Sequence, residues 1–510
     1  MDAPADNGSP SATAPGTSAV TAAPPRHPVA GRRLIESAVL FLSVLLLIRV
    51  VGVEPYSVPT GSMAPTLMGN HWAAVCPRCG YLVRVGVPNG NGERHFGRHG
   101  HAACPNCGCD ELPLDQTLIS RGDQLLVNKN VFDWRRPRRW EMAVFRCPVE
   151  PGKEFVKRVV GLPGEEVQLR DGDVYIDHDL ARKTLEEFQR LRILLFDHNY
   201  QPADGWQTRW QIQPPPLTLP SPPAGREGRV REGPAAPEGT GLRLNALRES
   251  DAYLWLGYRN WLLDVHKEEA IRDEYSYNGG DPAAAAAVHD FMLECDLEVL
   301  GGDGWVAFAI TDGLDEMTAE LPIGTVKEGA RLIGRQPTAD LDGESRVYRT
   351  APDFGLRVGR TYHVGLAFVD RRATLVVDGR PPFAPVDRPA AEQRGEVTRP
   401  VKVGARGVDV RLSNIRLFRD VHYTEAGQHG VRAPVRLGAG QYFVLGDNSP
   451  NSDDSRFWSD PEGNPAPVPE AYLVGKPFLV HLPSRAVRWQ GFGRQWQHQV
   501  LDWKRVRWLR

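Results

Sequence analysis

A serine in a glycine-containing loop is the first residue whose type and surroundings suggest covalent chemistry. Ser62 follows Thr60 and Gly61 and lies between Pro59 and Pro65. Residues that precede a proline avoid the helical region, so this loop is expected to be extended and rigid. An isolated serine in a loop is usually a turn or capping residue, and the loop alone does not define a nucleophile. A serine also needs a neighbouring base before it can attack a carbonyl carbon.

The candidate base is a lysine. No Gly-x-Ser-x-Gly elbow and no histidine–aspartate pairing is evident near the serine loop. In residues 155–160, strand alternation places Lys157 on the same face as Phe155 and Val159. An amine between apolar neighbours loses hydration, which lowers its pKa from about 10.4 toward neutrality. The alternative is a charged lysine on the surface of an edge strand.

Four cysteines form two Cys-x-x-Cys pairs separated by 24 residues: Cys76, Cys79, Cys104 and Cys107. Each pair can supply two thiolates to one tetrahedral ion, so the spacing predicts a zinc-ribbon-like insert with a structural zinc. Other residues nearby offer alternative ligands: Cys109, His95, His99 and His101. Two disulfides are the rival interpretation, which an extracytoplasmic location would favour.

The elements that must position these residues are expected to be strands. The 510 residues include 43 prolines and 51 glycines, which indicates a β-rich chain with more than one folded unit. A formal net charge of -2 gives no global field that would attract nucleic acid. Residues 124–127, 142–145 and 155–160 are short, β-branched runs bounded by turn residues. The fold class predicted from these runs is mainly β.

The N-terminal segment is expected to reach a membrane. Residues 31–53 are predicted to be a transmembrane anchor, although the uncharged core, Ser37–Ile48, has only twelve residues. The stretch reaches the required length of about 20 residues only if Glu36 and Arg49 lie at opposite interfaces. A cleaved secretory signal is the alternative, but no small-x-small site follows the core. Three basic residues would hold the N-terminus in the cytoplasm: Arg26, Arg32 and Arg33.

A second insert is expected in the middle of the chain. Residues 212–240 are rich in Pro and Gly and have the composition of a linker. Residues 241–425 have period-two strands, such as 291–300, and predict a β-sandwich or jelly-roll. The insert loosely resembles concanavalin-like and laminin-G-like sandwiches, which often bind carbohydrate, but no sugar site can be named. Residues 485–510 alternate Trp with basic residues, which suits either a membrane interface or docking on the β core.

Four ordered motifs resemble the conserved boxes of type I signal peptidases. They are TGSMAPT (60–66), RGD (121–123), FVKRVVGLPG (155–164) and GDNSPNSDDSRFW (446–458). The resemblance covers less than half of the chain, roughly 32–70, 116–178 and 435–482. It implies a serine endopeptidase, with a signal-peptidase-like antiparallel β core, that removes signal peptides from exported preproteins after Ala-x-Ala sequences. No cofactor is implied for the catalytic step.

The resemblance also implies a role for each matching residue. Ser62 would be the nucleophile and Lys157 the general base, and the Ser62 N–H with the Thr60 hydroxyl would form the oxyanion hole. Ser452 would orient the Lys157 amine. Three charged residues would hold the last loop in place: Asp454, Arg456 and Arg158. Ser449 departs from the family pattern, because many members have Arg at this position.

The predicted domain plan follows the chain from end to end. It consists of a disordered tail (1–30), a transmembrane anchor (31–53), the nucleophile loop of the protease core (54–70), a zinc-ribbon-like insert (71–115), the general-base strand of the core (116–180), a linker (181–240), a β-sandwich insert (241–425), the last box of the core (426–484) and a basic, Trp-rich tail (485–510).

The expected location is the inner membrane, single-pass, with the catalytic part outside the cytoplasm. Expected partners are signal peptides and membrane lipid, and no nucleic acid. An envelope adhesion module and a self-cleaving or regulatory protease are the competing functional classes.

Overall fold

The computed structural model describes residues 29–87, 102–202, 206–213, 241–247, 252–279, 285–335, 345–391, 393–491 and 494–509. The chain divides into two compact units, residues 1–52 and 53–510. The disordered tail expected at 1–30 lies almost entirely outside the described residues.

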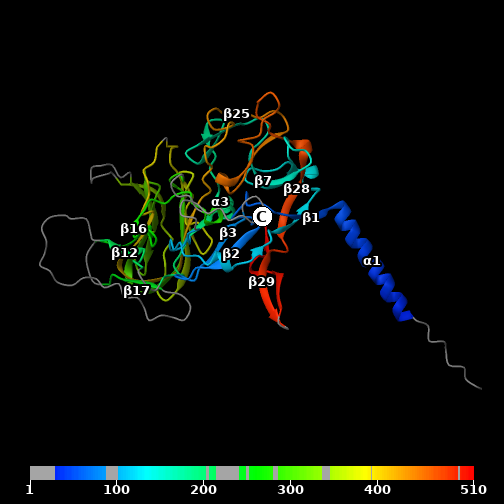
Figure 1. Ribbon diagram of the computed structural model, residues 1–510. Coiled ribbons are helices and arrows are strands. Elements are labelled where there is room, and N and C mark those ends of the chain that lie inside the picture. The colour runs from blue at the N-terminus through cyan, green and yellow to red at the C-terminus, as the bar shows by residue number, and fades with distance from the viewer. Residues whose placement is uncertain are drawn as a thin grey trace, which may run out of the picture. The chain divides into compact units, whose positions relative to one another are not determined.

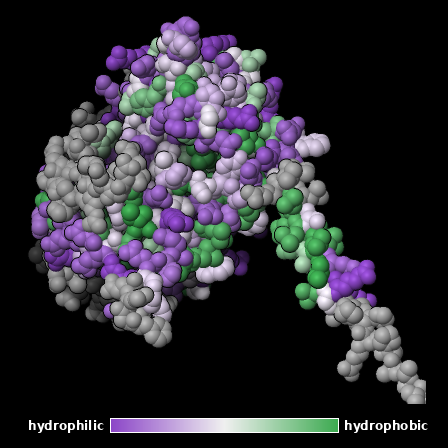
Figure 2. Space-filling model, turned by 45° about the vertical axis from the view of Figure 1, so that its right-hand side comes forward, coloured by the Kyte–Doolittle hydropathy of each residue, from purple (hydrophilic) through white to green (hydrophobic). Residues whose placement is uncertain are grey.

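The first unit contains one long helix, α1 (Val29–Val51). The described side chains from 31 to 46 are all exposed, and Figure 2 shows apolar side chains along this helix and a polar stretch at one end. Where the structure describes side chains, no helix is long and apolar enough to cross a membrane. The helix expected at 31–53 is present, and the membrane span is not confirmed.

The second unit contains an antiparallel sheet whose order differs from the order along the chain. Its path is β1-β5-β28-β6-β7-β26-β27, and β31 pairs with β28. The bounds are β1 Val53–Ser57, β5 Gln124–Asn128, β6 Met142–Arg146, β7 Glu154–Gly161, β26 Gln441–Leu445, β27 Val468–Pro469, β28 Leu473–Val480 and β31 Arg507–Trp508. Strands β5 and β28, which are more than 300 residues apart in the sequence, therefore lie side by side in one sheet with β1 (Figure 1).

A smaller sheet lies in the residues expected to form the protease core (54–70, 116–180 and 426–484), which are called the protease part below, and the larger sheet is called the protease sheet. Its order is β10-β9-β8-β25, with bounds β8 Glu166–Arg170, β9 Asp173–Ile176, β10 Asp179–Leu180 and β25 Val435–Arg436. The hairpin of β8 and β9 turns at Asp171-Gly172, and Gly172 has a positive φ of 84° that favours glycine. Val167 and Leu169 pack in one core cluster with Tyr275 and Tyr277. The two tyrosines belong to the middle of the chain, so the insert and the protease part share a core.

The first insert is a three-stranded sheet, β3-β2-β4, with bounds β2 His71–Val75, β3 Leu82–Gly86 and β4 Ile119–Ser120. One Cys-x-x-Cys pair lies in the turn between β2 and β3, and the other precedes β4. His95, His99 and His101, named as alternative ligands, lie outside the described residues. The four knuckle cysteines pack in the small core of this insert.

The second insert is a sheet of twelve strands. They are β11 Ile193–Asp197, β12 Trp210–Gln213, β13 Leu242–Asn245, β14 Leu254–Tyr258, β17 Phe291–Thr311, β18 Glu316–Ile323, β19 Ala330–Arg335, β20 Arg346–Ala351, β21 Thr361–Val369, β22 Arg372–Val377, β23 Val386–Asp387 and β24 Val401–Arg419. The two longest, β17 and β24, pair with each other along most of their length. Inward side chains from most of the twelve strands, together with a few from the connecting loops, form the largest core cluster of the described chain.

Short elements complete the second unit. They are α2 Val131–Trp134, α3 Leu185–Leu191, the ribbon of β15 Trp261–Leu262 and β16 Lys267–Glu268, and the 3-10 turns η2 Leu114–Gln116, η3 Ser276–Asn278, η5 Ser449–Asn451, η6 Glu470–Tyr472 and η7 Trp503–Arg505.

The insert begins earlier than the sequence predicts. The linker expected at 181–240 contains α3, β11 and β12. Thr184 and Glu187 form a capping box at the start of α3, and β11 pairs with β24. The linker prediction was wrong for 181–213, because the Pro- and Gly-rich composition that suggested it begins only at about residue 212.

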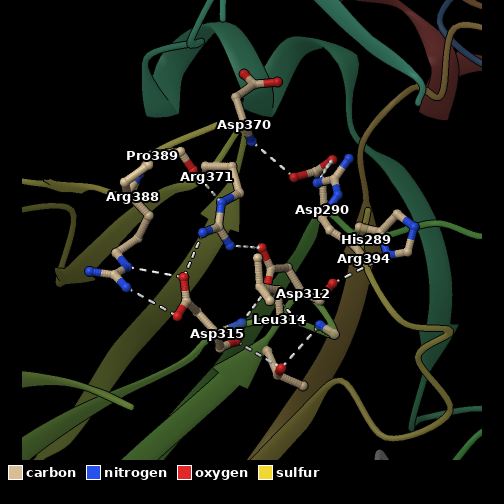
Figure 3. A network of polar contacts seen from close by, with 12 residues as sticks. His289, Asp290, Asp312, Leu314, Asp315, Asp370, Arg371, Arg388, Pro389 and Arg394 are labelled. Carbon is tan, nitrogen blue, oxygen red and sulfur yellow. Dashed lines mark hydrogen bonds and ion pairs between the residues drawn. The ribbon is translucent and has the colours of Figure 1, made fainter. Parts of the chain in front are cut away.

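Buried ion pairs hold the loops of the insert together and join them to the protease part. Figure 3 shows Arg371 between Asp312 and Asp315, with Arg388 also reaching Asp315. In the same region Arg394 contacts Asp290 of the insert and Asp173 of β9. Arg394 therefore links the two parts through charged contacts.

The C-terminal segment is folded and is not a tail. β29 (Ser484–Gly491) and β30 (Arg494–Leu501) form a hairpin, and β31 then joins the edge of the protease sheet. Arg505 forms a buried ion pair with Asp123. For residues 485–510 the sequence suited either a membrane interface or docking on the β core. The contacts of residues 505–508 show docking on the β core.

Candidate active site

Lys157 lies in the middle of the protease sheet. Its strand, β7, pairs with β6 on one side and with β26 on the other, so the edge-strand alternative is excluded. The side chain is 3% exposed, and its Nζ donates to Ser452 Oγ at 2.9 Å. Burial lowers the pKa of the amine to about 8, against the attraction of Asp454 and Asp453. A substantial fraction of the amine is therefore neutral near physiological pH.

The loop that carries Ser62 lies against the last motif. The Ser62 carbonyl oxygen accepts a hydrogen bond from Asn448 N at 3.0 Å, and the Gly61 oxygen accepts one from Asn448 Nδ2 at 2.9 Å. A Cβ placed on Gly446 would lie 2.4 Å from the Ser62 oxygen and 2.2 Å from Ser452 Oγ. Only glycine fits there. The backbone of Ser62 therefore lies close to Ser452, the residue that contacts Lys157.

Thr60 and Ser62 differ in exposure. Ser62 is half-buried, whereas Thr60 is exposed at the rim of the loop. A hydroxyl at an exposed position can meet a bound substrate. The oxyanion roles of the two residues stay predictions.

The supporting charges are buried and paired. Arg456 Nε donates to Asp454 Oδ1 at 2.8 Å, and both side chains are fully buried. Asp454 also accepts from Gly446 N at 3.1 Å. Arg158 donates to both carboxylate oxygens of Asp447. Leaving one partner of such a pair alone costs about 3 to 5 kcal/mol, so these contacts fix the loop that carries Ser452.

Ser449, which departs from the family pattern, has a structural partner of its own. Its Oγ accepts from Arg456 Nη1 at 2.8 Å and from Thr424 N at 2.9 Å. The small hydroxyl thus joins the last motif to the chain that returns from the insert.

Asp123 of the RGD motif holds the other end of the serine loop. Its Oδ2 accepts from Met68 N at 2.9 Å, and its Oδ1 pairs with Arg505. Arg507 also donates to the Thr66 oxygen. The two C-terminal arginines were not singled out by sequence reasoning, because their basic, Trp-rich surroundings suggested a surface tail.

A turn of the second insert also reaches the site. Tyr275 OH donates to the backbone carbonyl oxygen of Asp447 at 2.9 Å. Tyr277 OH donates to the backbone carbonyl oxygen of Asn70 at 3.2 Å. Asn278 exchanges hydrogen bonds with Asn448. Sequence reasoning missed this turn, because it assigned the segment to an independent domain and the segment has no strand periodicity.

The four knuckle cysteines converge on one point. Their sulfur atoms all lie within 4.8 Å of one another, and the Cys76–Cys107 and Cys79–Cys104 sulfur atoms are each 3.7 Å apart. A disulfide requires about 2.05 Å, and all seven cysteines are free and buried. Four thiolates at about 2.3 Å from a tetrahedral ion would lie about 3.8 Å from one another. The donor set therefore fits a zinc ion.

Comparison with known proteins shows which family two segments of this chain resemble. The family model described as signal peptidase, peptidase S26, matches residues 114–213 and 370–482. The two matched segments contain Lys157 and Ser452 and flank most of the second insert. The expected resemblance to type I signal peptidases is therefore confirmed over these segments. Ser62 lies outside both of them.

Individual relatives carry the name signal peptidase I. The chain is 28% identical over 148 residues to signal peptidase I of Rickettsia massiliae, which covers 29% of this chain and 44% of that protein. It is 29% identical over 156 residues to signal peptidase I of Pseudomonas aeruginosa, covering 30% of this chain and 41% of that protein. The chain thus spans less than half the length of the curated relatives it matches.

Solved structures resemble the chain only weakly. A β-glucanase of Bacillus licheniformis covers 44% of this chain at 10% identity, with a TM-score of 0.23 and 97% of its own length matched. A carbohydrate-binding module of Bacillus subtilis covers 41% of this chain at 11% identity, with the same TM-score of 0.23 and 95% of its own length matched. Likenesses of this degree carry no argument about function, and carbohydrate binding by the insert stays unsupported.

Proposed function

We propose that this chain is a membrane-bound signal peptidase I that removes leader peptides from exported proteins by Ser62/Lys157 chemistry. The observation that carries the proposal is the buried amine of Lys157, which lies 2.9 Å from Ser452 Oγ and has a pKa of about 8. A lysine on the surface stays hydrated and charged. A general base must be neutral to accept a proton, and burial favours the neutral amine.

The chemistry requires two proton transfers in each half of the reaction. Lys157 takes the proton from Ser62 Oγ as this oxygen bonds to the scissile carbonyl carbon, and the Ser62 N–H and Thr60 hydroxyl stabilise the oxyanion. The C–N bond then breaks as Lys157 gives its proton to the leaving amine, and an acyl-enzyme forms. Water next attacks the ester as Lys157 takes one of its protons. The ester C–O bond then breaks as Lys157 returns this proton to Ser62 Oγ, and the leader peptide leaves with a free carboxyl group.

Ser452, Asp454, Arg456 and Arg158 act as positioning residues in this proposal. Ser452 holds the amine of Lys157, and the three charged residues hold the loop of Ser452. The contacts described above support these roles because every one of them fixes either this loop or the strand of Lys157.

Membrane attachment through α1 is part of the proposal. Its described apolar side chains are exposed and have no protein core around them. They include Leu34, Ile35, Val39, Leu40, Phe41, Leu42, Leu45 and Leu46. Water is a poor environment for such a helix, so we place it in the inner membrane, with Arg32 and Arg33 on the cytoplasmic side and the catalytic part outside the cytoplasm.

A structural zinc is the second part of the proposal. Cys76, Cys79, Cys104 and Cys107 would hold one ion and would leave no open coordination position. When bound, the ion would hold the turn after β2 to the turn before β4, and the catalytic step would not involve it.

The experiment that tests the proposed function uses the full chain in lipid vesicles and a synthetic leader peptide with one Ala-x-Ala sequence. Mass spectrometry should find a single cleavage directly after this sequence. A matched peptide with bulky residues at both alanine positions should stay intact. An intact first peptide, or equal cleavage by a Ser62→Ala protein, would contradict the proposal. The adhesion-module alternative predicts no cleavage at all.

A further inference from the structure

We propose that Asn278, a residue of the second insert, is a positioning residue that orients the oxyanion donor of Ser62 by way of Asn448. This inference rests on the proposed function. The inference makes the insert a working part of the active site. In the sequence, Asn278 is about 120 residues from Lys157 and 170 from Asn448.

The turn that carries Asn278 is built into the protease part. Tyr275 and Tyr277 are buried in one core cluster with Val160 and Leu445 of the protease sheet. A Cβ placed on Gly61 would lie 2.1 Å from Tyr277 Cε1. The tyrosine ring therefore covers the peptide that precedes Ser62, and only glycine permits this approach.

The side-chain amides of Asn278 and Asn448 form a reciprocal pair. Asn278 Nδ2 donates to Asn448 Oδ1 at 2.7 Å, and Asn448 Nδ2 donates to Asn278 Oδ1 at 2.7 Å. The second hydrogen of Asn448 Nδ2 is donated to the Gly61 oxygen at 2.9 Å. With Asn278 in this orientation, a reversed Asn448 amide would place its Oδ1 against the Gly61 oxygen and its Nδ2 against Asn278 Nδ2, so the pair supports the orientation in which Asn448 donates to Gly61.

The Gly61 oxygen and the Ser62 N–H belong to the same peptide group. This group is planar and trans, so its oxygen and its N–H point in opposite directions. A hydrogen bond that holds the Gly61 oxygen therefore also sets the direction of the Ser62 N–H. The Ser62 oxygen is held at the same time by Asn448 N at 3.0 Å. The Gly61 oxygen also accepts from Ala64 N at 3.0 Å, so Asn448 Nδ2 is one of two donors that hold it. Asn448 thus contacts the backbone on both sides of the nucleophile, and Asn278 holds Asn448.

Loss of Asn278 should affect the transition state more than substrate binding. A donor in the oxyanion hole acts on charge that develops only during reaction, and complete removal of one such donor lowers kcat by about 10²- to 10³-fold. A Ser62 N–H that points in a wrong direction should lower kcat less than the complete removal of a donor. We expect Asn278→Ala to lower kcat by about tenfold and to leave KM within about twofold.

The variants separate hydrogen bonding from packing. Asn278→Leu keeps the approximate side-chain volume, and its kcat should fall as much as that of Asn278→Ala. Asn278→Asp keeps the acceptor for Asn448 Nδ2 and should recover part of kcat, and it also serves if the other two proteins fold poorly. Asn260→Ala is the matched control, because Asn260 Nδ2 donates to the Glu269 oxygen within the insert. This control should change thermal stability at most and should keep the wild-type kcat.

Hydrogen–deuterium exchange gives a readout that does not depend on leader cleavage. In Asn278→Ala, backbone amides of residues 59–70 and 446–452 should exchange faster than in the wild type and in Asn260→Ala. Wild-type kcat in both Asn278→Ala and Asn278→Leu, or exchange equal to that of the control, would overturn the inference. A wild-type protein that cleaves no leader would refute the proposed function instead, and the exchange rates would still decide the positioning role.

Discussion

Lys157 Nζ and Ser452 Oγ lie 2.9 Å apart although 295 residues separate them in the chain. The second insert occupies most of that separation. The two residues meet because β7 and β26 are neighbours in the protease sheet, and buried ion pairs hold the loop that follows β26.

Ser452→Ala removes the acceptor that holds the Lys157 amine. We expect kcat to fall by about 10- to 100-fold, because the general base is no longer oriented. A hydroxyl that accepts from the amine also favours its charged form, so the pKa of Lys157 should fall further and the rising limb of the pH profile should move to lower pH. Ser459→Ala is the control, since that hydroxyl contacts His429 instead. An unchanged pH profile in Ser452→Ala would contradict the assignment.

The rate of leader cleavage should rise with pH through about 8. Burial lowers the pKa of Lys157 to about 8 from 10.5, and only the neutral amine can accept the proton of Ser62. The pH dependence of single-turnover cleavage measures this limb. A rate that is constant from pH 6 to 10 would mean that no group with this pKa controls the reaction.

The same pKa makes a prediction about stability. Between pH 8 and 10.5 the unfolded chain binds a proton at Lys157 that the folded chain does not bind, so stability should rise with pH in this window. Below pH 8 the folded chain is destabilised by the full cost of burying the Lys157 amine, which is charged in the unfolded chain. Above pH 10.5 the amine is neutral in both states and this cost is absent. Lys157→Met should therefore be more stable than the wild type at pH 7, by up to roughly 3 kcal/mol. Chemical denaturation at pH 7 and pH 10.5 tests this, and equal differences at both values would contradict it.

Metal analysis should find about one zinc per chain. Cys76→Ser should lose this zinc and lower the melting temperature. Cys109→Ser should keep it, because Cys109 is not one of the four sulfur atoms that converge. A wild-type protein with no metal and with all four thiols in disulfides would refute the zinc site.

Local patterns in the sequence predict the elements that carry the candidate dyad. The alternation of residues 155–160 gives the strand and the buried face of Lys157, and Arg170 to Asp173 give the hairpin turn. These features depend on side-chain periodicity and on turn chemistry, which are encoded by neighbouring residues.

Contacts between distant segments could not be predicted in the same way. The insert begins at β11 rather than at residue 241, because the pairing of β11 with β24 joins residues that are more than 200 positions apart. The docking of Arg505 on Asp123 and of Asn278 on Asn448 also depends on tertiary packing. Neither contact leaves a periodic signal in the sequence.

Leader cleavage by Lys157→Arg, Ser62→Ala, Lys157→Ala and the Ser62→Ala/Lys157→Ala double variant tests the central claim most directly. The account predicts that each single change abolishes cleavage to a similar degree and that the double change costs little more, because the two residues act as a unit. Lys157→Arg should fail as well, since a guanidinium keeps its proton near neutrality. Substantial cleavage by a folded Lys157→Arg protein would contradict the account.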